Sequence, residues 1–257
     1  MAFDADRFRA QAREVKPKLG RPLMYMPITG STNDNALLAA RSGAPHGSLF
    51  VADEQTAGRG RRGNTWLAAP GESLLFSVLL RPKLELEQVS ALTLAVGLAL
   101  RDAVAPLLVE LVQIKWPNDL YVNKKKLAGI LVESQMQGDR LQAVVVGIGL
   151  NVATRDFPDE IAARATSLAV LGATELDREP LLQTVLGALA ERLDAYQLSG
   201  VAGILNELNA ADALRGERVR VDGQSGIGRG LDEQGRLLLE DEQGRTHAIL
   251  SGTVELL

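Results

Sequence analysis

The chain has 257 residues, of which 46% are apolar, and a formal net charge of -4 at pH 7. This length suits one large domain or two unequal ones, and the apolar fraction supports a packed core rather than a disordered chain. The sequence contains no cysteine, which excludes disulfides, thiol catalysis and thiolate metal sites, and its two histidines, His46 and His247, lie far apart. The acidic balance argues against binding nucleic acid through a broad basic surface.

The sequence also indicates where the protein works. Its N-terminal segment lacks the apolar core of a signal peptide. The longest apolar run, Ala91 to Leu100, is too short to cross a membrane. We therefore expect a cytoplasmic protein that binds neither DNA nor membranes.

Apolar spacing, capping residues and turn signals predict the elements of the larger part of the chain. In chain order we expect a short charged lead-in over residues 1–22, a helix over 31–43, strands over 49–52 and 73–80, a helix over 86–105, strands over 111–115, 120–122, 127–132 and 141–150, and a helix over 180–196. Pro106 ends the second helix, and the Pro117-Asn118-Asp119 segment forms a turn between two strands.

The composition changes near Leu214. From Arg218 onward, short strand-like runs alternate with glycine and charged residues, and Asp222-Gly223 is a turn signal. These features predict a small β-barrel-like domain that depends on the larger one for support. We place the lead-in at residues 1–22, the larger domain at 23–211 and the small domain at 212–257.

The strongest local signal is the run from Gly58 to Gly63, which reads GRGRRG. Glycines let a backbone approach a ligand closely, and arginines present planar, permanently charged groups that suit carboxylates and phosphates. The pattern favours an anion-binding loop that is mobile when empty. A solvated basic turn or a nucleic-acid contact is the alternative.

A second polar segment surrounds the turn at Asn118, whose amide can both donate and accept hydrogen bonds, as a purine edge requires. Lys126 opens an apolar strand, so its ammonium can point into a cleft, while Lys124 and Lys125 read as a solvated hairpin tip. Gly129 in mid-strand indicates close approach of a ligand or of another backbone.

Three further features carry weaker signals. Trp66 follows the GRGRRG run and either covers a flat ligand ring or packs in the core. The Ser31-Thr32-Asn33 segment either faces a small polar ligand or caps a helix. The strand that ends at Gly147 to Asn151 does not match a dinucleotide fingerprint and on its own indicates only packing against a neighbour.

Taken together and in order, these segments resemble biotin–protein ligases. The matching stretches are STN at 31–33, ADEQTAGRGRRGNTW at 52–66, KWPNDLYVNKKKLAGILVE at 115–133 and VVVGIGLNV at 144–152. The resemblance implies an α+β fold, in which a mixed β-sheet catalytic domain of the biotin/lipoate ligase type precedes a small C-terminal SH3-like β-barrel. It also implies that biotin and ATP form biotinyl-5′-AMP, and that a lysine of the biotin carboxyl carrier protein of acetyl-CoA carboxylase then accepts the biotin.

The resemblance also implies roles for particular residues, with Lys126 and Arg61 as the catalytic pair. The residues implied to bind biotin are Ser31, Thr32, Asn33, Gln55, Gly58, Arg59, Gly60, Arg61, Lys126 and Gly129. The residues implied to bind ATP are Arg61, Trp66, Asn118, Lys126 and Asn151. Magnesium is expected to arrive with ATP rather than in a dedicated metal site, Asp119 is a candidate to help the carrier lysine lose its proton, and a homodimer is compatible with the family.

The sequence departs from the family in three places. The residues before the match leave no room for the winged-helix domain of many bacterial members, so we expect a ligase without a DNA-binding domain. Asn64 stands where a basic residue is common, and the tail from Thr253 to Leu257 lacks the terminal arginine that some relatives place near ATP. Two alternatives stay open, namely a lipoate or octanoate ligase of the same fold and a non-catalytic biotin-binding sensor.

Overall fold

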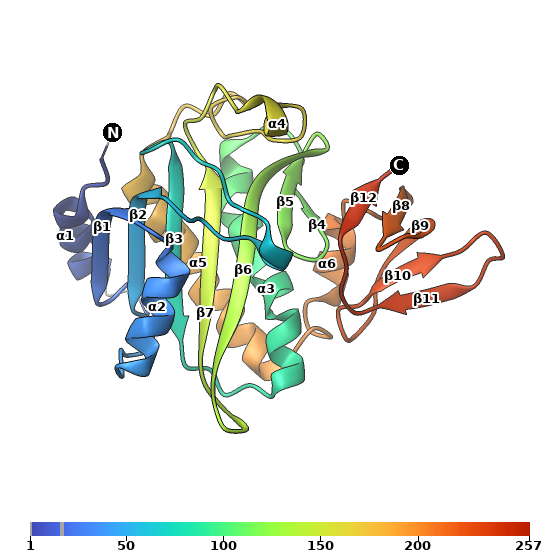
Figure 1. Cartoon of the computed structure of the whole chain (residues 1–257), viewed down its shortest axis with the longest axis horizontal. Coiled ribbons are helices and arrows are strands. Elements are labelled where there is room, and N and C mark those ends of the chain that lie inside the picture. Colours follow the sequence, from blue (N-terminus) through green and yellow to red (C-terminus); the bar gives the residue numbers. More distant parts are fainter. Residues whose placement is uncertain (1, 16–17) are drawn as a thin grey trace.

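The computed structural model describes residues 2–15 and 18–257, and within these residues the strands form two sheets. The strand order is β1-β2-β3-β7-β6-β5-β4 in the larger sheet and β11-β10-β9-β8-β12 in the smaller one. β1 and β2 run parallel, whereas the other neighbours in the larger sheet run antiparallel, so this sheet is mixed. Figure 1 shows the smaller sheet as a separate body beside the larger domain.

The elements lie as follows. Those of the larger domain are α1 (Ala5–Val15), β1 (Leu23–Thr29), α2 (Thr32–Arg41), β2 (Leu49–Gln55), η1 (Arg61–Gly63), β3 (Ser73–Leu80), α3 (Leu86–Val104), η2 (Ala105–Leu107), β4 (Gln113–Lys115), β5 (Asp119–Val122), β6 (Lys125–Gln137), β7 (Arg140–Asn151), α4 (Asp159–Ala162), α5 (Arg178–Ser199) and α6 (Leu205–Ala211). Those of the C-terminal domain are β8 (Arg218–Val221), β9 (Gln224–Leu231), β10 (Leu237–Glu240), β11 (Thr246–Ile249) and β12 (Val254–Leu256).

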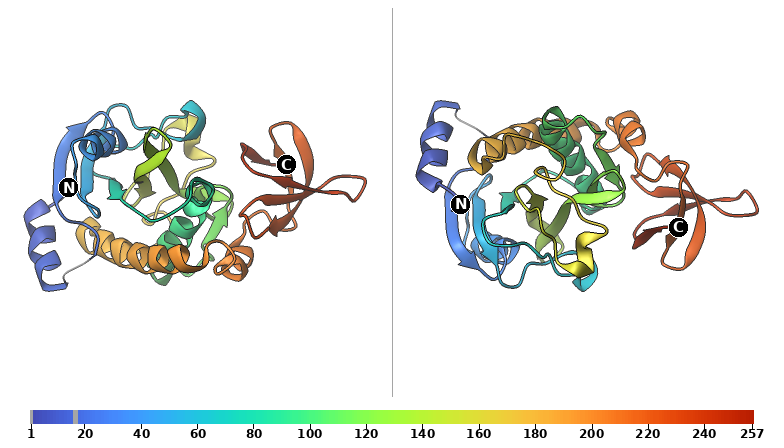
Figure 2. Two further views of the ribbon diagram at one scale, coloured as in Figure 1. Left: turned by 90° about the horizontal axis from the view of Figure 1, so that it is seen from below. Right: turned by 90° about the horizontal axis from the view of Figure 1, so that it is seen from above.

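Helices cover both faces of the larger sheet. On one face α2 packs against β2, β3 and β7, and on the other α3 packs against α5 and β6 (Figures 1 and 2). Because both faces are covered, every residue of β3, whose sequence is SLLFSVLL, is buried. The predicted α+β fold with a mixed sheet and a small C-terminal β domain is confirmed.

Several elements were not expected from the sequence, among them α1, β1 and α6. The lead-in forms α1 and packs against the larger domain, because Phe3 and Phe8 are buried in its core despite their charged neighbours. β1 contains Pro27, which argues against a strand, but β1 lies at the edge of the sheet, where a missing N–H is tolerated. α6 is too short to give a clear helical period.

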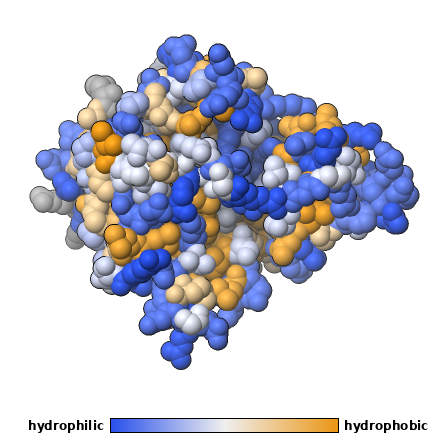
Figure 3. All heavy atoms as spheres, viewed as in Figure 1, coloured by the Kyte–Doolittle hydropathy of each residue, from blue (hydrophilic) through white to orange (hydrophobic). Residues whose placement is uncertain are grey.

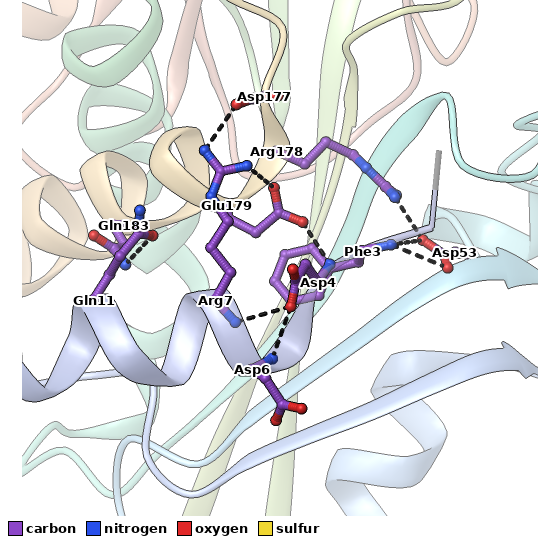
Figure 4. A network of polar contacts seen from close by, with 10 residues as sticks. All are labelled: Phe3, Asp4, Asp6, Arg7, Gln11, Asp53, Asp177, Arg178, Glu179 and Gln183. Atoms are coloured by element: carbon purple, nitrogen blue, oxygen red, sulfur yellow. Dashed lines mark hydrogen bonds and ion pairs between the residues drawn. The ribbon is translucent and has the colours of Figure 1, made fainter.

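A buried polar network fastens the N-terminal segment to the larger domain (Figure 4). The Asp53 carboxylate at the end of β2 accepts hydrogen bonds from the Phe3 N–H at 3.1 Å, from the Arg178 guanidinium at 2.7 Å and from the Tyr25 hydroxyl. Glu179 accepts the Asp4 N–H at 2.6 Å. Because Asp53 is almost fully buried, these partners offset the cost of its desolvation.

The segment that combines α3 and η2 is long and apolar enough to span a membrane by composition, and the described residues contain one such segment. The sequence-based prediction that no segment crosses a membrane rested on the central apolar run of this segment, Ala91 to Leu100. In the structure, 67% of the most apolar window is buried inside the protein. The helix therefore serves as core, packing against α5 and the sheet.

Asp212 lies between the two domains, directly after α6. Its Oδ1 accepts the Leu214 N–H at 2.9 Å, while among the described residues its buried Oδ2 has no hydrogen-bond partner. Burial raises the pKa of Asp212 to about 6, against smaller opposing effects of the Leu214 N–H and Arg215. The folded state therefore binds a proton at this carboxyl more tightly than the unfolded chain does.

This raised pKa predicts a pH-dependent contribution to stability. The stability that protonated Asp212 contributes is fully present below about pH 4, the ordinary pKa of this carboxyl in the unfolded chain. This stability is lost as the pH rises to about 6, the pKa in the folded state. Asp212→Asn keeps the acceptor for Leu214 and removes the charge, so it should raise the free energy of unfolding at pH 8 by up to about 3 kcal/mol and change it little at pH 4. Urea unfolding at both pH values measures this, with the exposed Asp139→Asn as control. An equal effect of Asp212→Asn at both pH values would contradict the assignment.

Candidate active site

One cavity, called the main cavity here because it gathers the motif segments, lies where the start of α2, the loop that carries η1, strands β6 and β7 and the C-terminal domain meet. Its walls are formed by residues 31–33, 55, 59–62, 64–66, 115–119, 126, 129–131, 147–149 and 252–254. The loop with η1 crosses the front of the sheet (Figure 1), and the centre of this face is strongly hydrophilic, with apolar patches beside it (Figure 3). The cavity thus combines all four motif segments with the C-terminal domain.

The first wall is the N-terminus of α2. Ser31 occupies the N-cap position, but its hydroxyl makes no capping hydrogen bond. Gln55 from the end of β2 replaces it, because its Oε1 accepts the Thr32 N–H at 2.7 Å and the Thr32 hydroxyl at 3.0 Å. The helix therefore starts at this segment, without a capping hydrogen bond from Ser31, and its first side chains line the cavity.

Asn33 and Ser77 form a buried pair behind this wall. The Ser77 hydroxyl, from the middle of β3, lies 2.6 Å from Asn33 Oδ1 and 2.8 Å from the Thr32 hydroxyl. Sequence reasoning did not single out Ser77, although a hydroxyl inside an otherwise apolar buried strand is a signal for a polar partner. The pair fixes the side chains of Asn33 and Thr32.

The second wall is the loop with η1, in which Arg61 is the inward-facing arginine. Its side chain is half-buried and its Nη1 lies 3.4 Å from the Asn118 Oδ1. Burial lowers the pKa of Arg61, and the charge of Arg62 lowers it further. Arg61 nevertheless stays protonated, because a guanidinium has an ordinary pKa above 12. The cavity therefore holds a permanent and partly desolvated positive charge.

The other two arginines of the loop bind carboxylates of the protein. Arg59 pairs with Glu133 at 2.6 Å and with Asp34 at 2.7 Å. Arg62 has a left-handed backbone with φ 54° and pairs with Asp222 of the C-terminal domain at 2.7 Å. The loop is thus attached to the sheet on one side and to the C-terminal domain on the other.

The third wall carries Lys126 at the start of β6. Its ammonium pairs with Asp119 at 2.7 Å and lies 5.4 Å from the centre of the Trp66 ring. The side chain folds back along its own strand, since a Cβ added at Gly129 would lie 3.0 Å from the Lys126 Nζ. Gly129 therefore leaves room for the lysine as well as for Trp66.

Lys115 is a further cation in the cavity, to which the sequence analysis assigned no role. Its Nζ donates to the Val254 carbonyl at 2.7 Å and to the Tyr121 hydroxyl at 3.2 Å. Burial is the largest influence on this lysine and lowers its pKa. Its position before the Trp-Pro-Asn-Asp turn was the available signal.

Trp66 separates the main cavity from a neighbouring hollow. The ring lies flat against strand β7, because a Cβ added at Gly149 would lie 2.4 Å from the Trp66 Cε2. The hollow beyond it is lined by residues 64–67, 119, 121, 126, 151, 160, 161, 164 and 165. Among the described residues, the buried Trp66 Nε1 has no hydrogen-bond partner, so this donor is available to a ligand.

The structure brings most of the predicted site residues to the main cavity. Asn151 lies in the neighbouring hollow instead, where its amide donates to the Thr166 carbonyl at 2.9 Å. Gly58 does not line either space, and it packs under Trp66, whose carbonyl oxygen would lie 2.7 Å from a Cβ at this position. Gly58 therefore shapes the loop rather than facing the cavity.

The charge of the main cavity is strongly unbalanced. Of its described lining residues, five are cationic, Arg59, Arg61, Arg62, Lys115 and Lys126, and one, Asp119, is anionic. Within the described part of the chain, no cluster of three or more histidine, aspartate or glutamate residues is placed to hold a metal ion. The arrangement is suited to an anionic ligand with a neutral polar part.

Two sequence profiles match the chain. The profile of the Biotin/lipoate A/B protein ligase family matches residues 25–151, and that of the Biotin protein ligase C terminal domain matches residues 216–257. The chain is 38% identical over 244 residues to the biotin--[acetyl-CoA-carboxylase] ligase of Mycobacterium tuberculosis, covering 91% of this chain and 88% of that protein. It is 36% identical over 244 residues to the bifunctional ligase/repressor BirA of Bacillus subtilis, covering 93% of this chain and 75% of that protein.

The fold is also similar to solved structures. The biotin protein ligase from Aquifex aeolicus in complex with biotin and ATP superimposes with a TM-score of 0.80 at 32% sequence identity, covering 92% of this chain and all of that one. The same enzyme in its apo form gives a TM-score of 0.77. The likeness extends over both domains.

The close contact of Trp66 with Gly149 gives a testable prediction. Gly149→Ala places a methyl group inside the indole ring and should displace the ring, lowering stability by about 1–3 kcal/mol. Tryptophan fluorescence and urea unfolding measure both effects. Gly187→Ala on α5 is the matched control, because its Cβ meets open space and should stabilise the helix slightly. Unchanged fluorescence in Gly149→Ala would show that Trp66 does not lie on this strand.

Proposed function

The chain belongs to the biotin protein ligase family, and we infer that it is an enzyme that attaches biotin to a carrier lysine at the expense of ATP. The observation that carries this inference is the cavity itself, in which cationic side chains stand beside a neutral polar wall. Biotin has the matching chemistry, because its ring system is neutral and polar and its chain ends in a carboxylate. The triphosphate of ATP supplies the second anion.

The first step joins two anions. A carboxylate oxygen of biotin attacks the α-phosphorus of ATP, the bond from that phosphorus to the bridging oxygen breaks, and pyrophosphate leaves. Arg61 and Lys126 reduce the repulsion between the reactants and stabilise the charge that develops at phosphorus. No histidine or cysteine base is needed, because a carboxylic acid of ordinary pKa is already ionised at neutral pH.

The second step transfers biotin to the carrier. The lysine amine attacks the carbonyl carbon of biotinyl-5′-AMP, the bond to the phosphate oxygen breaks, and AMP leaves. The amine must lose a proton, and we assign Asp119 as the acceptor. Its carboxylate already lies 2.7 Å from the Lys126 ammonium, so it stands at the junction that the first step creates.

The cavity walls suggest how the substrates divide between them. Ser31, Thr32, Asn33 and Gln55 hold the biotin rings, with Gly60 and Gly129 leaving room for them. Arg59 completes the loop around this end. Trp66 and Asn118 hold the adenine side together with Asn151, which lies in the hollow beyond the indole ring.

Magnesium, the carrier and the assembly complete the proposal. A resident metal site does not fit the main cavity, whose one described carboxylate, Asp119, is paired with Lys126. We therefore treat Mg²⁺ as part of the substrate MgATP. The carrier is a biotin carboxyl carrier protein of acetyl-CoA carboxylase, the reaction takes place in the cytoplasm, and the edge strand β1, with Ile28 63% exposed, is available for a homodimer.

Pyrophosphate release separates this proposal from its alternatives. The purified protein with MgATP should release pyrophosphate with biotin and not with lipoate or octanoate, and it should then label a purified carrier domain with biotin. Release with lipoate alone would identify a lipoate ligase. Biotin binding without pyrophosphate release would identify a non-catalytic sensor.

Lys126 gives the first prediction for the reaction. Lys126→Ala should lower the rate of biotinyl-5′-AMP formation about a hundredfold or more, because it removes one fixed charge from the carboxylate–phosphate junction. Lys125→Ala is the control, because this neighbour is exposed and lies outside the cavity. Single-turnover formation of the adenylate measures the effect. A near-normal rate in Lys126→Ala would place the junction elsewhere.

Arg61 gives the second prediction for the reaction. Arg61→Ala should speed the dissociation of biotinyl-5′-AMP by about tenfold or more, because a charge-assisted contact from the loop is lost. Release of radiolabelled adenylate during a chase with unlabelled biotin measures it. Arg140→Ala, at the exposed β6–β7 turn, controls for the loss of an arginine. If the two variants release the adenylate equally slowly, Arg61 does not hold the intermediate.

A further inference from the structure

Three motif segments meet at Glu133, a residue that lines neither the main cavity nor the neighbouring hollow. Side chains alternate along a strand, so Glu133 projects from the same face of β6 as Gly129 and Leu131, which do line the cavity. Its Oε2 lies 2.7 Å from the Asn33 Nδ2 and 2.6 Å from the Arg59 Nη2. One carboxylate oxygen therefore joins the start of α2 to the loop that carries η1.

We propose that Glu133 is a positioning residue for biotin binding, which holds Asn33 in one orientation and fixes the loop through Arg59. The inference rests on the proposed function, because it concerns the biotin end of the same cavity. In this proposal Glu133 binds two side chains of the protein, Asn33 and Arg59, and does not contact the substrate. The consequences for each partner are distinct.

For Asn33, the carboxylate determines which way the amide points. The Asn33 Nδ2 donates to Glu133 and to the Leu131 carbonyl at 3.3 Å, while its Oδ1 lies 2.6 Å from the Ser77 hydroxyl. The amide also packs tightly on β7, since a Cβ added at Gly147 would lie 2.1 Å from its Oδ1. A carboxylate can only accept hydrogen bonds, so Glu133 selects the amide orientation in which the NH₂ group of Asn33 faces the carboxylate.

For the loop, the carboxylate offsets repulsion among arginines. Arg59, Arg61 and Arg62 lie within four residues, and bringing them together over the sheet is unfavourable without counter-charges. Arg59 receives them from Glu133 and Asp34, so its own charge is largely neutralised by the protein. Arg61, two residues further on, also lines the cavity but forms no ion pair with a described carboxylate, and its Nη1 lies 3.4 Å from the Asn118 Oδ1.

The geometry distinguishes this contact from an ordinary surface ion pair. The Glu133 side chain is 24% exposed, against 56% for Asp34 and 45% for Asp222. Exposed pairs contribute little because water and salt screen them, whereas a mostly buried carboxylate with two charge-assisted or amide donors is costly to disrupt. Glu133 is therefore the least exposed of the three carboxylates that bind the loop, and its contact is the one least screened by solvent.

The test is Glu133→Gln, which keeps the shape of the side chain and removes its charge. Adenylate formation should show a KM for biotin raised about tenfold or more, with kcat changed by less than about threefold. Trypsin should cleave within the GRGRRG loop about tenfold faster in the ligand-free variant, because the loop opens more often. Trypsin cleavage after Arg61 and Arg62 should be faster in Arg59→Gln as well, and no faster in the double variant than in either single one, because both changes break the same contact. Arg59→Gln should raise the KM for biotin less than Glu133→Gln does, because it keeps the contact between Glu133 and Asn33.

Glu240→Gln is the matched control. Glu240 also pairs with an arginine, Arg229, and its side chain is 32% exposed, but it lies in the C-terminal sheet away from the cavity. Its KM and its loop cleavage should equal those of the wild type. Thermal unfolding of all variants shows whether a change reflects the loop or a loss of the fold.

Each result decides a separate question. Wild-type KM and cleavage rate in Glu133→Gln would overturn the positioning role, as would additive effects of Glu133→Gln and Arg59→Gln on cleavage after Arg61 and Arg62. Failure of the wild-type protein to release pyrophosphate with biotin would instead overturn the proposed function. The cleavage rate of the loop would still test the contact of Glu133 with Arg59 in that case.

Discussion

The site depends on holding several positive charges close together in a partly desolvated space. The lowered pKa values of Arg61 and Lys115 show that burial disfavours their charged forms. Carboxylates bind Arg59, Arg62 and Lys126, and a backbone carbonyl binds Lys115. All of these partners except Asp119, which binds Lys126, come from distant parts of the chain. Anionic substrates supply the remaining counter-charge, so their binding should stabilise the folded protein as well as react within it.

The larger sheet forms the surface on which the side chains of the site lie. Glycines at 129, 147 and 149 sit on neighbouring positions of β6 and β7, with Gly129 directly opposite Gly149. Side chains at these positions would collide with Asn33, Trp66 or Lys126. The glycines therefore let large polar and aromatic groups lie on a strand surface that would otherwise be covered by its own side chains.

How much of this the sequence predicts depends on whether the signal is local. The strand that spans 73–80 and the helix that starts at 86 are predicted well, because apolar spacing and a following proline are local features. The gathering of STN, GRGRRG and KLAGIL at one cavity is predicted only from the order of motifs that a family shares. The pairs Ser77–Asn33, Arg59–Glu133 and Arg62–Asp222 are not predictable in this way, since each joins residues more than forty positions apart.

The contribution of the C-terminal domain to the cavity is also not predictable from the sequence. None of the motif segments that the sequence assigns to the site lies in this domain. In the structure, residues 252–254 line the cavity, and the Val254 carbonyl accepts from the Lys115 ammonium. Backbone groups depend on position rather than on residue type, and the position is set by the Trp116 Nε1 contact with the Gly235 carbonyl and by the Arg62 pair with Asp222. The domain can therefore complete the cavity with a sequence that carries no motif for it, provided that its docking onto the larger domain is kept.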